Sequence, residues 1–130
     1  MPTVLEEKEA IRELLSAYCL HTDRKNAEAR LALFAEDAVW DAGKYGRFEG
    51  RGALREYMAK SAANPARFRH LTLNEMITVS GATASSFSYV LVLKLEEDRT
   101  PVPFSTRFYE DHLVKKDGRW LFRSRVIKAD

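Results

Sequence analysis

The spacing of hydrophobic residues predicts an amphipathic helix at the start of the chain. Thr3 followed by Glu6 forms the capping-box pattern, in which each side chain satisfies a backbone N–H at a helix N-terminus. After this cap, apolar side chains recur at helical spacing, at Leu5, Ile11, Leu14, Leu15 and Tyr18. We expect this helix to run to about Leu20. Asp23 then falls just past its last turn.

Two shorter helices are expected before the chain becomes β-rich. Asn26 can cap a helix whose apolar positions are Leu31, Leu33 and Phe34, and a short strand follows at Ala38 to Asp41. The glycine-rich segment from Ala42 to Gly52 predicts a turn, a short strand and a second turn. A third helix is expected over Ala53 to Ala63. It should end there because the proline of Asn64-Pro65 disfavours a helical conformation in the residue before it.

The second half of the chain shows the pattern of a β-sheet. Turn residues at Ser80-Gly81, Glu96 to Pro101 and Asp117-Gly118 separate four strands, expected at Phe68 to Val79, Thr83 to Leu95, Val102 to Lys115 and Arg119 to Ile127. Short connections make them an antiparallel meander. Helices followed by a long curved sheet predict an α+β fold with a hollow between the two layers.

Composition limits the classes of function. The chain has 130 residues with 45% hydrophobic content, which fits one domain over residues 1–130. Its net charge is only +2, and basic and acidic residues alternate, so no nucleic-acid partner is expected. The single cysteine, Cys19, excludes an intrachain disulfide and favours a reducing compartment. No run is long enough to span a membrane, so we predict a cytoplasmic protein.

Asp23 and His70 stand out as candidate chemistry. One lies at the end of a helix and the other in the middle of an apolar strand. An acid that reaches an imidazole across the core fixes the ring tautomer and stabilises the imidazolium formed on proton abstraction. Two ordinary interpretations compete: His70 as a core histidine bonded to a backbone carbonyl, and Asp23 as a residue that completes a local turn.

Four motifs occur in the order and spacing of a known family. They are I-x-x-L-L-x-x-Y-x-x-x-x-D at Ile11 to Asp23, L-F-A-E-D-A-V-W-D at Leu33 to Asp41, R-H-L-T-L-N at Arg69 to Asn74 and D-G-R-W at Asp117 to Trp120. Through these four motifs, nearly the whole chain resembles the SnoaL-like branch of the nuclear-transport-factor-2-like (NTF2-like) superfamily. The resemblance implies a cone-shaped α+β barrel with N-terminal helices packed on a curved, mostly antiparallel sheet.

The resemblance also implies roles for particular residues. Asp23 and His70 match the aspartate/histidine pair of scytalone dehydratase and hexachlorocyclohexane dehydrochlorinase. Arg125 falls where the dehydrochlorinase has a catalytic arginine, and Tyr18 replaces its lysine. Arg123 lies two residues from Arg125 and is expected on the same face of the strand, so it is an alternative.

Further residues are candidates for substrate contacts. Aromatic and apolar walls are expected from Phe34, Trp40, Tyr45, Phe68, Met76, Tyr89 and Phe108. Asn74 is an even number of residues from His70, so we expect it on the same strand face. In the ketosteroid isomerases, another branch of the superfamily, the base lies at the position of Asp41. Asp41 is otherwise expected to be a strand-end residue in contact with solvent.

These observations predict a cofactor-independent lyase, specifically a dehydratase, that acts on a small hydrophobic molecule. A ketosteroid-isomerase-like isomerase or cyclase using Asp41, and a non-catalytic ligand-binding module, are the alternatives. His21 and His112 lack the spacing of metal ligands, so no metal is expected, and no nucleotide fingerprint is present. Apolar residues Leu91, Leu93 and Val114 on the open sheet face predict a homodimer or homotrimer.

Overall fold

The computed structural model describes residues 1–130, and its first element is a helix, α1, spanning Val4–Asp23. The predicted capping box is confirmed: the Glu6 N–H donates to Thr3 Oγ1 at 3.2 Å, and the Glu6 carboxylate accepts from the Thr3 backbone. The helix extends past the predicted end at Leu20, so Asp23 belongs to its last turn. It ends because Lys25 adopts a left-handed conformation with φ of 60°.

The next helix is short and the strand after it begins earlier than expected. Helix α2 covers Ala27–Leu31, and Asn26 caps it as predicted by accepting from the Ala29 N–H. Strand β1 spans Phe34–Asp41. Phe34 was therefore wrongly placed in the helix. Phe34 pairs with Phe122 in a distant parallel strand, and a local pattern cannot show that pairing.

The glycine-rich segment folds as predicted into a turn, a short strand and a helix. A 3₁₀ turn, η1, at Gly43–Tyr45 leads to strand β2 at Arg47–Glu49, and helix α3 covers Arg51–Ala63. Gly46, with φ of 135°, is required here, because a Cβ at this position would lie 2.9 Å from the Phe48 ring. The segment thereby turns back so that β2 pairs with β1.

Four long strands form the predicted antiparallel meander. They are β3 at Arg67–Ser80, β4 at Thr83–Leu95, β5 at Pro101–Lys116 and β6 at Arg119–Lys128. The sheet order is β2-β1-β6-β5-β4-β3, in which only β1 and β6 are parallel. Bulges interrupt the ladders, including one between Leu73 and Met76 in β3. They curve the sheet and increase its twist.

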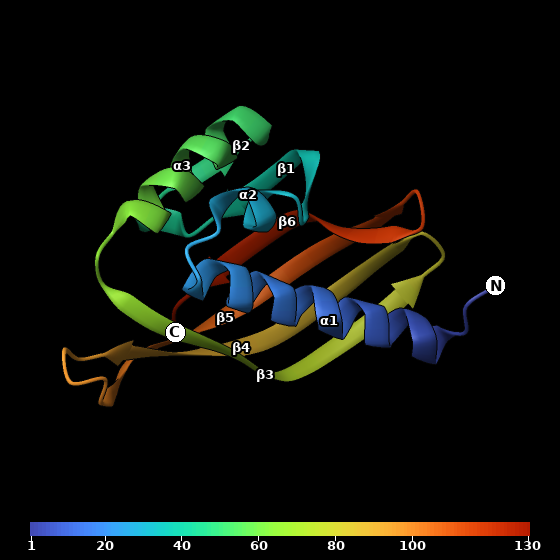
Figure 1. The fold of residues 1–130 in the computed structure, drawn as a ribbon. Coiled ribbons are helices and arrows are strands. Elements are labelled where there is room, and N and C mark those ends of the chain that lie inside the picture. The colour runs from blue at the N-terminus through green and yellow to red at the C-terminus, as the bar shows by residue number, and fades with distance from the viewer.

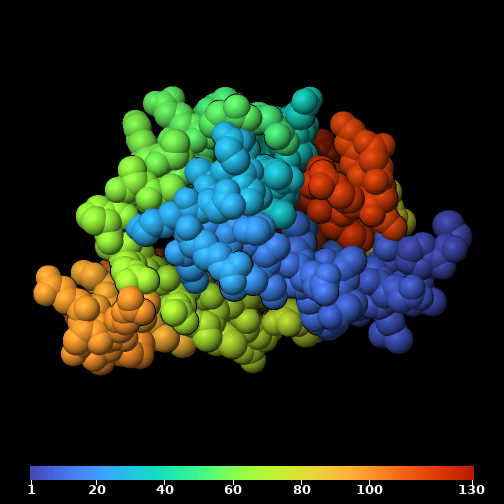
Figure 2. Space-filling model, viewed as in Figure 1, coloured from blue at the N-terminus to red at the C-terminus, as the bar shows by residue number.

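The helices and the sheet form two layers, which confirms the predicted α+β class. Helix α1 runs across β3, β4 and β5, while α2 and α3 lie over the β1 end of the sheet (Figure 1). In the space-filling view these three helices cover the middle of the sheet (Figure 2). The hydrophobic core lies between the layers, and the opposite face of the sheet carries no helix.

Candidate active site

A cavity of about 220 Å³ lies between the helical layer and the sheet. All three helices and five strands contribute to its wall. The lining residues are Tyr18, Thr22, Lys25, Arg30, Trp40, Tyr57, Ser61, Asn64, Ala66, Phe68, His70, Val90, Val92, Arg107, Tyr109 and Ile127. Four of the predicted site residues are therefore together in one cavity: Tyr18, Trp40, Phe68 and His70.

Asp23 holds His70 through two hydrogen bonds. Its Oδ1 lies 2.6 Å from Nδ1 of the His70 ring, and its Oδ2 accepts from the His70 backbone N–H at 2.9 Å. Both side chains are largely buried, at 19% exposure for His70 and 13% for Asp23. Since β3 is an edge strand, its backbone N–H is free to bind α1 in place of a neighbouring strand.

This geometry fixes how the His70 ring can act. With Nδ1–H donating to the carboxylate, the neutral ring presents the lone pair of Nε2, for which the protein offers no hydrogen-bond partner. His70 lines the cavity and Asp23 stands behind it. The arrangement can therefore accept a proton from a molecule in the cavity and stabilise the imidazolium that results. The interpretation of Asp23 as a residue that only completes a turn does not fit these contacts.

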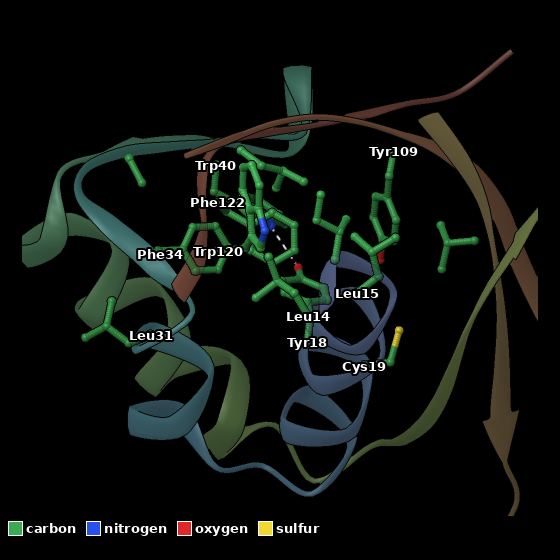
Figure 3. Close-up of a cluster of buried hydrophobic side chains, with 14 of the residues drawn as sticks. Leu14, Leu15, Tyr18, Cys19, Leu31, Phe34, Trp40, Tyr109, Trp120 and Phe122 are labelled. Carbon is green, nitrogen blue, oxygen red and sulfur yellow. Dashed lines mark hydrogen bonds between the residues drawn. The ribbon is translucent and has the colours of Figure 1, made fainter. Parts of the chain in front are cut away.

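Tyr18 projects from α1 toward Trp40, and its hydroxyl group accepts a hydrogen bond from the Trp40 ring (Figure 3). Arg30 Nη2 donates to Tyr18 Oη at 2.8 Å, and Trp40 Nε1 donates at 2.9 Å. Both acceptor positions of the phenol oxygen are then occupied, which leaves its proton to be donated elsewhere. Tyr18 can thus act as a hydrogen-bond donor to a ligand in the cavity.

Aromatic rings form one side of the site. The rings of Trp40 and Tyr57 lie 4.4 Å apart, and Phe48 stacks on Tyr57 at 4.5 Å. Burial raises the pKa of Tyr57, so its hydroxyl group remains protonated. Phe68 packs edge-on to His70 at 6.4 Å. These contacts limit the orientations available to a ligand and to the His70 ring.

Arg125 is not part of the cavity wall, contrary to the expectation that it contacts the departing group. Its guanidinium makes two hydrogen bonds to Asp111, at 2.7 and 2.9 Å, and both side chains are fully buried. It also lies over the rings of Tyr18 at 4.3 Å and Tyr109 at 3.6 Å. Arg125 therefore supports the core beneath Tyr18, and its charge is already compensated by Asp111.

Arg123, the alternative to Arg125, does not share its face. Arg123 is exposed, and the register between β5 and β6 shifts at this point, so that His112 pairs with Ser124 and Leu113 with Phe122. An extra residue in one strand reverses the alternation of side chains beyond it. The expectation of a common face was therefore wrong.

Several other predicted site residues also lie outside the cavity. Phe34 is fully buried in the core, 5.0 Å from the Phe122 ring. Asp41 accepts from the Gly43 N–H at 2.8 Å and lies 3.8 Å from Arg47, so it stabilises a turn. Neither residue is placed to contact a molecule in the cavity.

The remaining candidates lie on the outer surface. Asn74 is exposed, because it is the residue that the β3 bulge inserts, and its φ is 57°. The predicted alternation from His70 ends there. Tyr89 and Phe108 contact each other at 5.3 Å on the sheet face away from the helices. Met76 and Tyr45 are 73% and 66% exposed.

Arg30 is a cavity residue that was not predicted from the sequence, although a signal was present. Arg30 is only 4% exposed and lines the cavity. Ala27, Arg30 and Leu31 have the i, i+3, i+4 spacing of a single helix face, which places a charged residue on the buried side of α2. Lys25 and Arg107, which also line the cavity, follow no comparable pattern. Their positions depend on how separate elements pack.

No group of three or more His, Cys, Asp or Glu side chains is placed to hold a metal ion. None of the α-helices combines the length and apolar character needed to cross a membrane.

The sequence profile of the SnoaL-like domain matches residues 3–126. No protein in the search of curated proteins matches the chain. Among solved structures, a variant of Rv3472, a protein of unknown function from Mycobacterium tuberculosis, is 30% identical with a TM-score of 0.87, over 95% of this chain and 72% of that one. A Novosphingobium aromaticivorans protein provisionally named a scytalone dehydratase is 28% identical with a TM-score of 0.82, over 95% and 83% of the two chains.

A third similar structure is described by its fold. It is a Nostoc punctiforme protein of unknown function with a cystatin-like fold, 27% identical with a TM-score of 0.85. The match covers 98% of this chain and 93% of that chain. The cone-shaped arrangement of helices on a curved sheet is therefore shared by proteins from several bacteria.

Proposed function

The chain belongs to the SnoaL-like domain family, and from that premise we propose that it is a cofactor-independent lyase, specifically a dehydratase, with His70 as its general acid and base. The observation that carries the proposal is the 2.6 Å contact between Asp23 Oδ1 and His70 Nδ1 at the wall of the cavity. The similarity to a protein named a scytalone dehydratase supports the same class of reaction.

The proposed reaction begins when Nε2 of His70 takes a proton from a carbon next to a carbonyl group. The electron pair of the broken C–H bond forms an enolate, whose oxygen accepts a hydrogen bond from the Tyr18 hydroxyl group. The enolate then collapses, a C=C bond forms, and the C–O bond at the next carbon breaks. The leaving hydroxyl group takes the proton back from His70 and departs as water. Asp23 stabilises the imidazolium between the two steps.

Two alternatives are less well supported. An isomerase that uses Asp41 as its base requires that carboxylate to face the ligand, and Asp41 instead bonds to Gly43 in a turn. A non-catalytic binding module would gain support from a wide separation of Asp23 and His70, whereas the two side chains are in hydrogen-bond contact. The lyase is therefore the best-supported function.

The test uses small aromatic β-hydroxy ketones as substrates and mass spectrometry to follow loss of water. His70→Ala should lower kcat/KM about 10²- to 10⁴-fold, the usual contribution of a positioned general base. Asp23→Asn should lower it by a similar order, because the amide stabilises the imidazolium less well and can favour the wrong ring tautomer. The exposed residues His112 and Asp37 provide matched controls: His112→Ala and Asp37→Asn should leave turnover unchanged.

A second measurement isolates proton abstraction from departure of the leaving group. In D₂O, an aryl ketone that lacks the hydroxyl group should exchange its α-proton for deuterium when bound to the wild-type protein, as NMR can follow. His70→Ala should abolish this exchange while the protein remains folded by circular dichroism. Equal exchange or equal turnover in the wild type and His70→Ala would refute the proposed role of His70.

A further inference from the structure

The cavity contains a buried positive charge that no carboxylate of the protein compensates. We propose that the cavity binds a small aromatic anion, a carboxylate or phenolate, with its charged oxygen directed to Arg30 and Tyr18. This anion site lies in the same cavity as the proposed lyase site. Anion binding itself does not depend on catalysis, and the proposed function is needed only for the conclusion that the substrate is such an anion.

Arg30 differs from the other buried arginine in its partners. Arg125 is paired with Asp111, whereas Arg30 makes no ion pair. Its one short hydrogen bond goes to the neutral Tyr18 hydroxyl group, its Nη1 lies 3.5 Å from Ser61 Oγ, and its buried Nε has no partner. A buried charge without a counterion is unfavourable. An anion in the cavity would remove that cost.

The hydrogen bonds around Arg30 also direct a donor to the ligand. The guanidinium lies 4.8 Å from the Tyr18 ring centre and 5.4 Å from that of Tyr57, and both of these residues line the cavity. Arg30 and Trp40 both donate to Tyr18 Oη, so the Tyr18 proton is polarised and available to an acceptor. A negatively charged oxygen is the acceptor that gains most from this arrangement.

The charged residues of the cavity lining also favour an anionic ligand. Lys25, Arg30 and Arg107 all line the cavity, and no carboxylate does. Asp23, which contacts the lining residue His70, is already engaged by two hydrogen bonds to it. The adjacent rings of Trp40 and Tyr57, which both line the cavity, favour a flat, aromatic body for the ligand. With about 220 Å³ available, the cavity can hold a substituted single ring, since an apolar cavity of about 150 Å³ accommodates benzene.

Benzoate and benzamide provide a direct test, because they have nearly the same shape and differ in charge. Isothermal titration calorimetry of the wild-type protein should show about 10- to 100-fold tighter binding of benzoate, the range expected for a charged over a neutral hydrogen bond. Phenolates can be compared with anisoles in the same way, which distinguishes the two kinds of acidic oxygen. Equal affinities within both pairs, or no binding of any of these ligands, would overturn the proposal.

Variants assign the preference to Arg30. Arg30→Met should remove most of the preference for benzoate while leaving the affinity for benzamide similar. Arg30→Gln removes the charge but keeps a donor for Tyr18, and it replaces Arg30→Met if that variant does not fold. His70→Ala should retain the preference, so that a failure of the proposed catalysis is distinguishable from a failure of anion binding. A preference that survives the loss of the Arg30 charge would refute the assignment.

Discussion

At the scale of single residues, the most buried charges of the protein form the Arg125–Asp111 pair. Burial disfavours a charged arginine, but the Asp111 carboxylate outweighs this effect and raises the pKa of Arg125 above its ordinary value. The same guanidinium lies between aromatic rings of the core, including Tyr18. The pair therefore holds the floor of the cavity in place without touching its contents.

We expect the Arg125–Asp111 pair to affect stability mainly because neither buried charge is left unpaired. The attraction between the two charges should contribute less. Arg125→Met leaves the Asp111 carboxylate buried and unpaired, and should lower the free energy of unfolding by about 3 to 5 kcal/mol in urea denaturation. The double variant Arg125→Met with Asp111→Leu removes both charges and should recover much of that loss. A double variant less stable than Arg125→Met would contradict this account.

Cys19 should be almost unreactive in the folded protein. It is 6% exposed, its Sγ lies 3.2 Å from Thr72 Oγ1, and burial raises its pKa. The unfolded chain therefore loses the thiol proton first as pH rises, so Cys19 lowers stability only above about pH 8.5. Iodoacetamide at pH 8 should label Cys19 slowly in buffer and rapidly in urea. Ser16 is exposed three residues earlier, and Ser16→Cys should add one rapidly labelled thiol.

At the scale of elements, the bulge in β3 decides which residues face the cavity. The strand directs His70 and Thr72 toward the helices, but the extra residue at Asn74 shifts the alternation, so that Ile77 is buried and Met76 exposed. The bulge also permits the edge strand to curve around α1. The conformation of this one residue thus determines which side chains in each half of β3 face the helices.

Asn74 should be replaceable by glycine but not by a β-branched residue. Its φ of 57° is left-handed, a conformation that asparagine and glycine adopt readily. Asn74→Val should lower the free energy of unfolding by about 1 to 2 kcal/mol, measured in urea, whereas Asn74→Gly should change it little. Similar losses in both variants would indicate that the Asn74 side chain, and not its backbone, is what matters.

The sequence was informative where local signals suffice and uninformative where distant pairing decides. Turn residues separated the four long strands correctly, and the Thr3 and Asn26 caps located two helix starts. The strand start at Phe34 depends on parallel pairing with β6, which leaves no local trace. Bulges in β3 and β6 likewise place the Asn74 and Arg123 side chains on a different face from the predicted one. In the site, Asp23 and His70 followed from the pattern, while Lys25 and Arg107 depend on tertiary packing.

At the scale of the whole molecule, the sheet has one covered and one bare face. Leu71, Leu73, Met76, Phe87 and Tyr89 on the bare side are each at least 38% exposed. The rings of Phe87 and Phe108 stack at 5.6 Å within this surface. A continuous apolar surface of this kind is unusual on a monomer and is typical of a subunit interface.

We therefore expect the protein to assemble through the bare sheet face as a homodimer or homotrimer. Sedimentation equilibrium of the wild type should give a mass above that of one chain, and Phe87→Glu should shift the protein toward monomer, because a charge would be buried in the interface. Leu5, 77% exposed on α1, provides the matched control, and Leu5→Glu should not change the mass. A monomeric wild type at working concentration would contradict the prediction.

The two hydrogen bonds that Asp23 makes to the main chain and the ring of His70 have a consequence for how activity arises during folding. One carboxylate both docks the edge strand onto the first helix and aligns the reactive nitrogen. Under the proposed lyase function, turnover cannot precede the meeting of these two segments, so its recovery after dilution from denaturant would time a single docking event. Catalysis would then report directly on this step of folding.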